Sequence, residues 1–277
     1  RQNTTGLNSQ GRAIVADHSS GCVYAGHFDR GVSQQSSVFR TCSAGDRWDF
    51  LGGYSGSVHL PDRGLRIDGS ITNIAVDYSS PASARRVLVS AGMPGPKAAV
   101  WLYDPAGSPS WTSLFSASGV LERAAQGPHT YPHLPRLALM ALSNEVTVLD
   151  LQEGKSKTIA LHGPALLPAA QITAVATLDI AAQPAGDAAV KVLIGGKSIR
   201  GPGVFSASFS SADATANATA VAEFADMVDP SLAAGVSRMA VTALVVKPGS
   251  EGPTVVAGLG VGDFYDGDIP PGLFVSN

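Results

Sequence analysis

A short apolar segment that ends on small residues occurs four times in the sequence, at residues 23–26, 87–92, 192–196 and 255–258. Each copy is rich in β-branched side chains and closes on Ala, Gly or both, which is typical of a β-strand that lies in crowded surroundings. A strand type that recurs in this way is the signature of a repeat architecture. The sequence therefore predicts an all-β fold built from similar units.

Three further strand types accompany this segment. Alternating strands that end near an Asp are predicted at residues 12–17, 71–77 and 172–179. Apolar-aromatic strands are predicted at residues 37–40, 99–102, 203–206 and 272–275, and strands that begin with Trp at residues 48–51 and 111–114. Each unit is therefore interpreted as four short strands.

We predict about five units within residues 12–277, after an N-terminal polar segment at residues 1–11. The units begin near Arg12, Ile71, Arg136, Ile172 and Met239. The middle unit is the least regular, with strands expected at residues 136–141, 145–151 and 157–161 and without the aromatic strand. It is interpreted either as a compact blade or as a connecting hairpin.

A four-stranded antiparallel sheet of this kind cannot bury both of its faces alone, whereas radially packed copies cover one another. The predicted fold is therefore a β-propeller of four-stranded antiparallel blades. The alternative is a β-sandwich, which has no reason to repeat one order of four strands. Because the last unit stops after its third strand, we expect the chain to be part of a larger propeller, although residues before Arg12 remain an alternative source of the missing strand.

The composition agrees with many short strands joined by turns. Hydrophobic residues make up 44% of the chain and charged residues only 15%, with 31 Gly and 18 Pro. The net charge of −3 and the absence of a basic cluster argue against a nucleic-acid partner. Pro168, Gln171 and Asp179 interrupt the longest apolar run, so we expect no insertion into a membrane.

Cysteines and glycosylation motifs point to the outside of the cell. Cys22 and Cys42 border two strands that would pair as a hairpin, which predicts a disulfide; two buried free thiols are the alternative. Asn3 and Asn217 each begin an N-glycosylation motif. We therefore expect a secreted or cell-surface glycoprotein.

The turn before Trp48 has a distinctive spacing. Gly45 lies three residues before the tryptophan, and Ser43 and Thr41 precede that glycine at alternate positions. The corresponding residues of the second unit are Asp104, Gly107 and Trp111, with one extra residue before the tryptophan.

Both turns resemble the Asp-box, or BNR, repeat of sialidase-like, Vps10-like and glycoside-hydrolase propellers, in which the turn reads Ser-x-Asp-x-Gly-x-x-Trp. In that repeat the Ser and Asp side chains hydrogen-bond the turn backbone, and the Trp packs into the blade. Thr41 and Ser43 stand where the motif has Ser and Asp. The resemblance implies a propeller but no single activity, because the repeat occurs in hydrolases, receptors, assembly factors and lectins.

We predict no catalytic residues. The arginine triad and the Arg-Ile-Pro sequence of sialidases are not visible in the chain. Asp17, Asp77 and Asp179 are expected at strand ends and could form the carboxylate pair of a glycoside hydrolase. An Asp that recurs at one point of a repeat more often caps a turn, which is the interpretation we favour.

Two clusters could hold a metal. Asp263, Asp266 and Asp268 lie in a glycine-containing loop with the oxygen chemistry of a calcium site; a solvated loop is the alternative. His129 and His133 have helical ligand spacing, but Pro132 between them excludes the helix, so we predict a loop there without a metal. No other cofactor is indicated.

The sequence favours a non-enzymatic extracellular module that binds protein or carbohydrate partners through loops on one face of its blades. The alternative is a glycoside hydrolase acting on a surface or cell-wall polysaccharide. Two acidic side chains facing one cleft would favour the enzyme.

Overall fold

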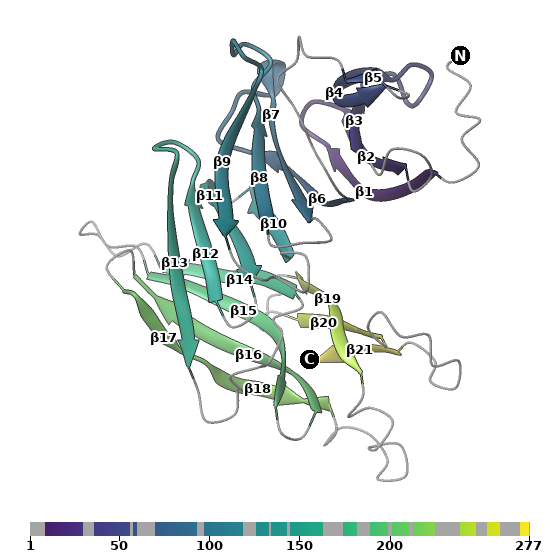
Figure 1. The fold of residues 1–277 in the computed structure, drawn as a ribbon. Helices are drawn as coiled ribbons and strands as arrows, with labels where there is room; N and C mark the ends of the chain where they lie inside the picture. Colours follow the sequence, from purple (N-terminus) through teal and green to yellow (C-terminus); the bar gives the residue numbers. More distant parts are fainter. Residues whose placement is uncertain are drawn as a thin grey trace. The chain divides into compact units, whose positions relative to one another are not determined.

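The chain folds almost entirely into β-strands, as the computed structural model in Figure 1 shows. A turn of 3-10 helix, η2 (Ala82–Ala84), lies between β6 and β7. No helix in this part of the chain is long and apolar enough to cross a membrane. The structure describes residues 9–29, 36–55, 58–59, 70–92, 97–118, 126–132, 134–142, 145–162, 174–181, 189–198, 201–210, 213–224, 239–247, 254–260 and 272–276.

The chain divides into two compact units, each of which is described by itself. Unit 1 comprises Arg1–Ala138 and Leu149–Ser156, and unit 2 comprises Leu139–Val148 and Lys157–Asn277.

The first sheet has the order β1-β2-β3-β4-β5, with antiparallel neighbours throughout. Its strands are β1 (Ser9–Asp17), β2 (Cys22–Asp29), β3 (Ser36–Thr41), β4 (Asp49–Ser55) and β5 (Val58–His59). The predicted strand quartet is confirmed. β1 begins at Ser9, before the predicted start of the first unit at residue 12, and Ser9 pairs with Asp29 of the long strand β2.

The second sheet is an antiparallel quartet with the order β6-β7-β8-β9. Its strands are β6 (Ser70–Asp77), β7 (Arg86–Gly92), β8 (Lys97–Tyr103) and β9 (Trp111–Ser118). All four coincide with predicted strands. Both of the first two sheets carry a register shift in the first strand, between Gly11 and Ala13 in β1 and between Ile71 and Asn73 in β6.

The third sheet has the order β10-β11-β12-β13-β17 and contains residues of both units. Its first four strands are β10 (Gln126–Tyr131), β11 (Leu134–Leu142), β12 (Glu145–Asp150) and β13 (Lys155–His162). The middle unit is thus a full sheet and not a connecting hairpin. Its predicted start near Arg136 was wrong because β10 contains Gly127 and Pro128, which are poor strand residues. His129 therefore lies in a strand and not in the predicted loop.

The fourth sheet is antiparallel with the order β14-β15-β16-β18. Its strands are β14 (Ala174–Ala181), β15 (Ala189–Ser198), β16 (Gly201–Phe209) and β18 (Thr219–Glu223). The strand between β16 and β18 in the chain, β17 (Thr215–Asn217), belongs to the third sheet, where it pairs in parallel with β13. The fifth sheet contains β19 (Ala240–Lys247), β20 (Thr254–Gly260) and β21 (Gly272–Ser276).

Successive antiparallel sheets with meander order define the fold class as all-β, of the β-propeller type. The predicted fold class is confirmed. Apart from β17, each sheet uses neighbouring chain segments, so most of each blade can form locally before it packs on another.

The first two sheets of unit 1 share one core, in which the side chains of one sheet pack against those of the other. Its fully buried members include Tyr24, Val38 and Leu51 from the first sheet and Val76 and Val87 from the second. Small residues end the second strand of each predicted unit, and at Gly26 close packing explains why the residue is small. A Cβ atom there would lie 2.7 Å from the Cγ2 of Ile71 in β6, so only glycine allows this approach.

Unit 2 has its own core between the fourth and fifth sheets. Buried side chains of this core come from both sheets and from the ends of their strands, namely Leu193, Val204, Phe224, Met239, Val241, Ala257 and Leu259. The two cores agree with the expectation that each blade hides its apolar face against a neighbouring blade.

Candidate functional site

The repeated aspartates stabilise turns. The Asp17 Oδ1 accepts hydrogen bonds from the Ser19 backbone N–H at 3.1 Å and from its hydroxyl at 2.6 Å. The Asp77 Oδ1 accepts the same pair from Ser79, at 2.9 and 2.5 Å. These contacts support the turn-capping interpretation. Asp179 lies inside β14, in register with Lys191 of β15, and not at the strand end that was predicted.

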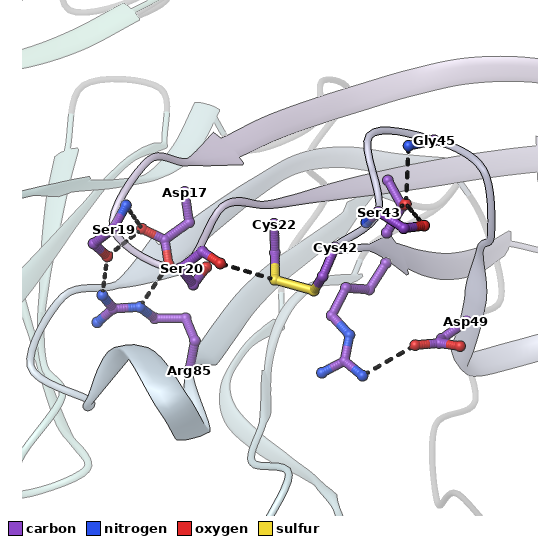
Figure 2. The surroundings of a disulfide bond; sticks show 11 residues. Asp17, Ser19, Ser20, Cys22, Cys42, Ser43, Gly45, Asp49 and Arg85 are labelled. Atoms are coloured by element: carbon purple, nitrogen blue, oxygen red, sulfur yellow. Dashed lines mark hydrogen bonds and ion pairs between the residues drawn. A yellow bond between two sulfur atoms is a disulfide. The ribbon is translucent and has the colours of Figure 1, made fainter.

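Arg85 connects the two turns in the interior of unit 1, and Figure 2 shows its contacts with the Asp17 turn. Its Nε donates to the Asp17 Oδ2 at 2.8 Å, and its other guanidinium nitrogens donate to the Ser19 hydroxyl and to the backbone oxygens of Asp77 and Ser80. The side chain is only 7% exposed, and the Asp17 side chain is fully buried. Both charged groups therefore serve the packing of sheet on sheet and are unavailable to a ligand.

The contacts around Asp17 also set its acidity. Burial raises the pKa of its carboxyl group. Hydrogen bonds from Ser19, Ser20 and Arg85 together lower the pKa by a larger amount, so the resulting pKa is about 2. Asp17 is therefore an ionised structural group and not a general acid.

The predicted disulfide between Cys22 and Cys42 is present, with a Cα–Cα distance of 4.2 Å. Val23 of β2 pairs with Thr41 of β3, which places the two cysteines opposite each other at the end of the hairpin. Closing a loop of this size, with a sequence separation of 20, removes unfolded-state entropy worth about 3 kcal/mol. In Figure 2 the disulfide lies between the Arg85 network and the turn that starts at Ser43.

The turn between β3 and β4 is held by hydroxyl groups. The Thr41 Oγ1 accepts the Gly45 N–H at 3.2 Å, and the Ser43 Oγ accepts the Arg47 N–H at 3.1 Å. Gly45 has a φ of 94°, which favours glycine at this position. Thr and Ser thus make the kind of contacts that the resemblance assigns to Ser and Asp.

The two tryptophans of these turns have different surroundings, which the resemblance did not predict. Trp111 is 2% exposed, and its indole N–H donates to the backbone oxygen of Leu51 in β4 at 3.0 Å. Trp48 is 43% exposed. The expectation that Trp48 packs into the blade is therefore wrong, because its ring lies instead at the rim of a pocket.

This pocket lies within unit 1 and has a volume of about 350 Å³. It is formed where β3, the following turn and β4 of the first sheet meet the end of β8 of the second sheet. The lining residues are Arg40, Arg47, Trp48, Asp49, Phe50, Leu51 and Tyr103. We refer to this cavity as the Trp48 pocket.

One carboxylate and two guanidinium groups give the Trp48 pocket its charge. The Oδ2 of Asp49 lies 3.2 Å from an Arg40 terminal nitrogen, and its Oδ1 lies 3.3 Å from the Arg47 Nε. Arg47 is 84% exposed, whereas Arg40 is 30% exposed. The Nε of Arg40 is buried and has no hydrogen-bond partner among the described residues. The three groups together carry one net positive charge.

Sequence reasoning missed the Trp48 pocket. A local signal existed in the consecutive residues Arg47, Trp48 and Asp49, which place a cation, an aromatic ring and a carboxylate together. Arg40 and Tyr103 reach the pocket only because β4 pairs with β3 and the second sheet packs against the first. No spacing rule in the sequence indicates that arrangement.

The imidazole of His129 in β10 has a strongly shifted pKa. Burial lowers the pKa of His129 to about 4, and its buried Nε2 has no hydrogen-bond partner among the residues that the structure describes. His133 lies outside the described residues, and no group of three or more His, Cys, Asp or Glu side chains in the described ranges could hold a metal ion.

We expect His129 to make unit 1 sensitive to mild acid. The His129 imidazole becomes protonated near pH 6.5 in the unfolded chain and only near pH 4 in the folded chain. The free energy of unfolding is therefore highest above pH 6.5, and at pH 4 it is lower by about 3 kcal/mol. All three Trp residues (48, 101 and 111) lie in unit 1, so urea unfolding followed by Trp fluorescence reports on this unit. His129→Gln should flatten the pH dependence between 4 and 7, and an unchanged pH dependence in this variant would contradict the assignment to His129.

The other predicted sites stand as follows. Asn217 lies in β17 with an exposed side chain. Asn3 and the three aspartates of the predicted calcium loop, Asp263, Asp266 and Asp268, lie outside the described residues. Glycosylation and calcium binding stay predictions.

The known proteins that resemble the chain are found among solved structures alone. No protein-family model and no curated protein matches the chain. Among solved structures, the chain is similar to the N-terminal domain of Nup159, with 9% identity over 95% of this chain and 57% of that one, and a TM-score of 0.47. An endo-arabinase from Bacteroides thetaiotaomicron gives 9% identity, 95% and 92% coverage and a TM-score of 0.38.

A fructofuranosidase from Schwanniomyces occidentalis gives 10% identity over 91% of this chain and 52% of that one, with a TM-score of 0.38. The chain thus spans little more than half the length of the Nup159 domain and of the fructofuranosidase. At these identities and TM-scores, none of the likenesses assigns a ligand or an activity to the chain.

Proposed function

We propose that the chain is a non-enzymatic extracellular module of the Asp-box propeller type, and that it binds a protein or carbohydrate partner at the Trp48 pocket. The observation that carries this proposal is the composition of the pocket. It combines an exposed tryptophan ring with one carboxylate that two arginines already neutralise.

An exposed tryptophan suits binding better than stability. The ring of Trp48 leaves 43% of its surface in water, so covering it with a partner would gain hydrophobic free energy that the folded chain does not yet have. Tryptophan and arginine are also the residue types that most often dominate binding energy at interfaces. Trp48 and Arg47 stand next to each other in the turn.

The charges of the pocket do not suit hydrolysis of a glycoside. That reaction requires two carboxyl groups on opposite sides of the scissile bond, one to protonate the leaving group and one to act as nucleophile or base. Among the described residues, Asp49 is the only carboxylate that lines the Trp48 pocket, and two guanidinium groups contact it. Asp17 and Asp77 are buried in turns and in ion pairs with Arg85 and Arg86.

Two observations support the extracellular part of the proposal. A disulfide joins Cys22 and Cys42, and such bonds persist mainly in oxidising compartments. The side chain of Asn217 is exposed, as an N-glycan acceptor has to be. The hydroxyl-to-backbone hydrogen bonds of the turn at Thr41 and Ser43 support the Asp-box assignment.

The proposal is tested by a binding screen on glycans and extracellular proteins, run beside a hydrolysis assay on a polysaccharide panel. Trp48→Ala and Arg47→Ala should weaken binding to the partner that the screen identifies. Arg136→Ala is the matched control, because it also removes an exposed arginine that is paired with carboxylates, here Asp150 and Glu153. Binding unaffected by Trp48→Ala, or turnover that an Asp→Asn change abolishes, would contradict the proposal.

A further inference from the structure

The Trp48 pocket has the chemistry to recognise a carboxylated saccharide. We propose that its ligand is an acidic sugar unit of a glycan, with the ring against Trp48 and the carboxylate on Arg47 and Arg40. This inference rests on the proposed function and specifies the class of ligand that the same pocket binds.

The aromatic ring is the first part of the argument. Trp48 is 43% exposed, whereas the neighbouring aromatic residues Tyr103 and Trp111 are 6% and 2% exposed. A half-exposed indole presents a flat, apolar and electron-rich face. The C–H face of a sugar ring is flat enough to stack on it, whereas the hydroxyl groups at the ring edge remain free for polar contacts.

The cations are the second part. Arg47 is held at one nitrogen by Asp49, and the side chain is 84% exposed, so most of its N–H groups face solvent. A guanidinium group binds a carboxylate through two parallel hydrogen bonds, which gives direction as well as strength. The net positive charge of the Arg40, Arg47 and Asp49 group favours an anionic ligand over a neutral one.

Asp49 is the third part, and it favours a saccharide over an acidic peptide. Its carboxylate is 39% exposed and only accepts hydrogen bonds. Neighbouring sugar hydroxyls can donate to Asp49 and at the same time accept from Arg40 or Arg47. The donors of an acidic peptide are its backbone N–H groups, at one per residue, whereas a sugar ring presents several adjacent hydroxyl groups that both donate and accept.

The size of the pocket is consistent with this ligand. A volume of about 350 Å³ lies at the lower end for small-molecule sites. The pocket therefore suits a short portion of a glycan and not a long stretch of polymer.

The inference is tested with pairs of oligosaccharides that differ only in charge, such as tetragalacturonic acid and its methyl ester, together with uronic-acid and neutral members of a wider glycan panel. Isothermal titration of the whole chain should give at least about tenfold tighter binding of the acid than of the ester, the loss expected for one charge-assisted hydrogen bond. Raising the salt concentration should weaken binding of the acid more than of the ester.

Variants separate the contributions of the ring and the charge. Arg47→Ala should reduce binding of the acid about tenfold and binding of the ester much less, whereas Trp48→Ala should weaken both. Arg136→Ala removes the same charge elsewhere and should change neither. Arg47 is exposed, so circular dichroism should confirm that its variant keeps the fold.

Each outcome decides the inference. Equal affinity for acid and ester across the panel would overturn it, as would failure of every saccharide to bind. If an acidic peptide or a protein binds at the Trp48 pocket while saccharides do not, the ligand class is wrong but the proposed function stands. If binding occurs yet Trp48→Ala has no effect on any ligand, the proposed function itself fails.

Discussion

Replacing Arg85 by Ala should lower the free energy of unfolding of unit 1 by about 3–5 kcal/mol, because it leaves the buried Asp17 carboxylate without its counter-ion. The same change removes the donors of the Ser19 hydroxyl contact and of the Asp77 and Ser80 backbone oxygens. Urea unfolding followed by Trp fluorescence measures the effect, since every tryptophan lies in unit 1. Arg136→Ala, at an exposed ion pair, should have a far smaller effect.

A second variant separates the loss of the pair from the loss of packing. If the unpaired charge of Asp17 causes the destabilisation, then adding Asp17→Asn to the Arg85 variant should restore part of the stability. The Arg85 variant should also raise the pKa of Asp17 from about 2. As the solution is acidified, Asp17 should then become protonated at a higher pH than in the unchanged chain. Equal effects of the Arg85 and Arg136 replacements would show that Arg85 does not join the two sheets.

Replacing Trp111 by Ala should destabilise unit 1 by about 3–5 kcal/mol, the range for truncating a buried aromatic side chain. Trp111 is buried against Tyr103, with ring centroids 5.1 Å apart, and its N–H binds the backbone oxygen of Leu51. Trp111→Phe keeps most of the buried area but leaves that oxygen without its donor, so we expect a loss of about 1–3 kcal/mol. The same fluorescence-detected urea titration measures both variants.

Trp48→Ala is the internal comparison for this prediction. Its ring is half-exposed, so the change should reduce stability much less than Trp111→Ala does. If both tryptophans prove equally important for stability, then Trp48 packs as the Asp-box pattern implies, and its role in binding loses its support. The two residues therefore test the contrast between a structural and a ligand-binding tryptophan at equivalent points of the repeat.

Strand types in this chain could be predicted because they depend on local chemistry. The β-branched second strands, the strands that end in Asp17 and Asp77, and the Cys22–Cys42 pairing all follow from alternation and from antiparallel register. The turn at Thr41 to Gly45 was also recognisable, because its side-chain hydrogen bonds join residues two to four positions apart. Such interactions leave a pattern in the sequence itself.

Other parts of the structure have no local pattern. β10 contains Gly127 and Pro128, and it is a strand because β11 offers it an edge to pair with. The three-residue strand β17 pairs with β13, which lies more than fifty positions earlier in the chain. Arg85 was not singled out because its partner Asp17 belongs to another sheet. These features depend on tertiary packing, which overrides propensity.

The Trp48 pocket combines both kinds of information. Its cation, ring and carboxylate are consecutive in the sequence, yet the exposure of Trp48 depends on how the turn leaves β3 and on the position of Tyr103. The motif that suggested a buried tryptophan was correct for Trp111 and wrong for Trp48. The turn before Trp48 thus has side-chain-to-backbone hydrogen bonds while its tryptophan remains exposed.

The most direct test of binding at the Trp48 pocket is an NMR titration that follows the three indole N–H signals, one for each tryptophan of the chain. On addition of a ligand identified by the screen, the Trp48 signal should shift in proportion to saturation, whereas the signal of the buried Trp111 should stay in place. A saturating ligand that leaves the Trp48 signal unmoved would contradict the account.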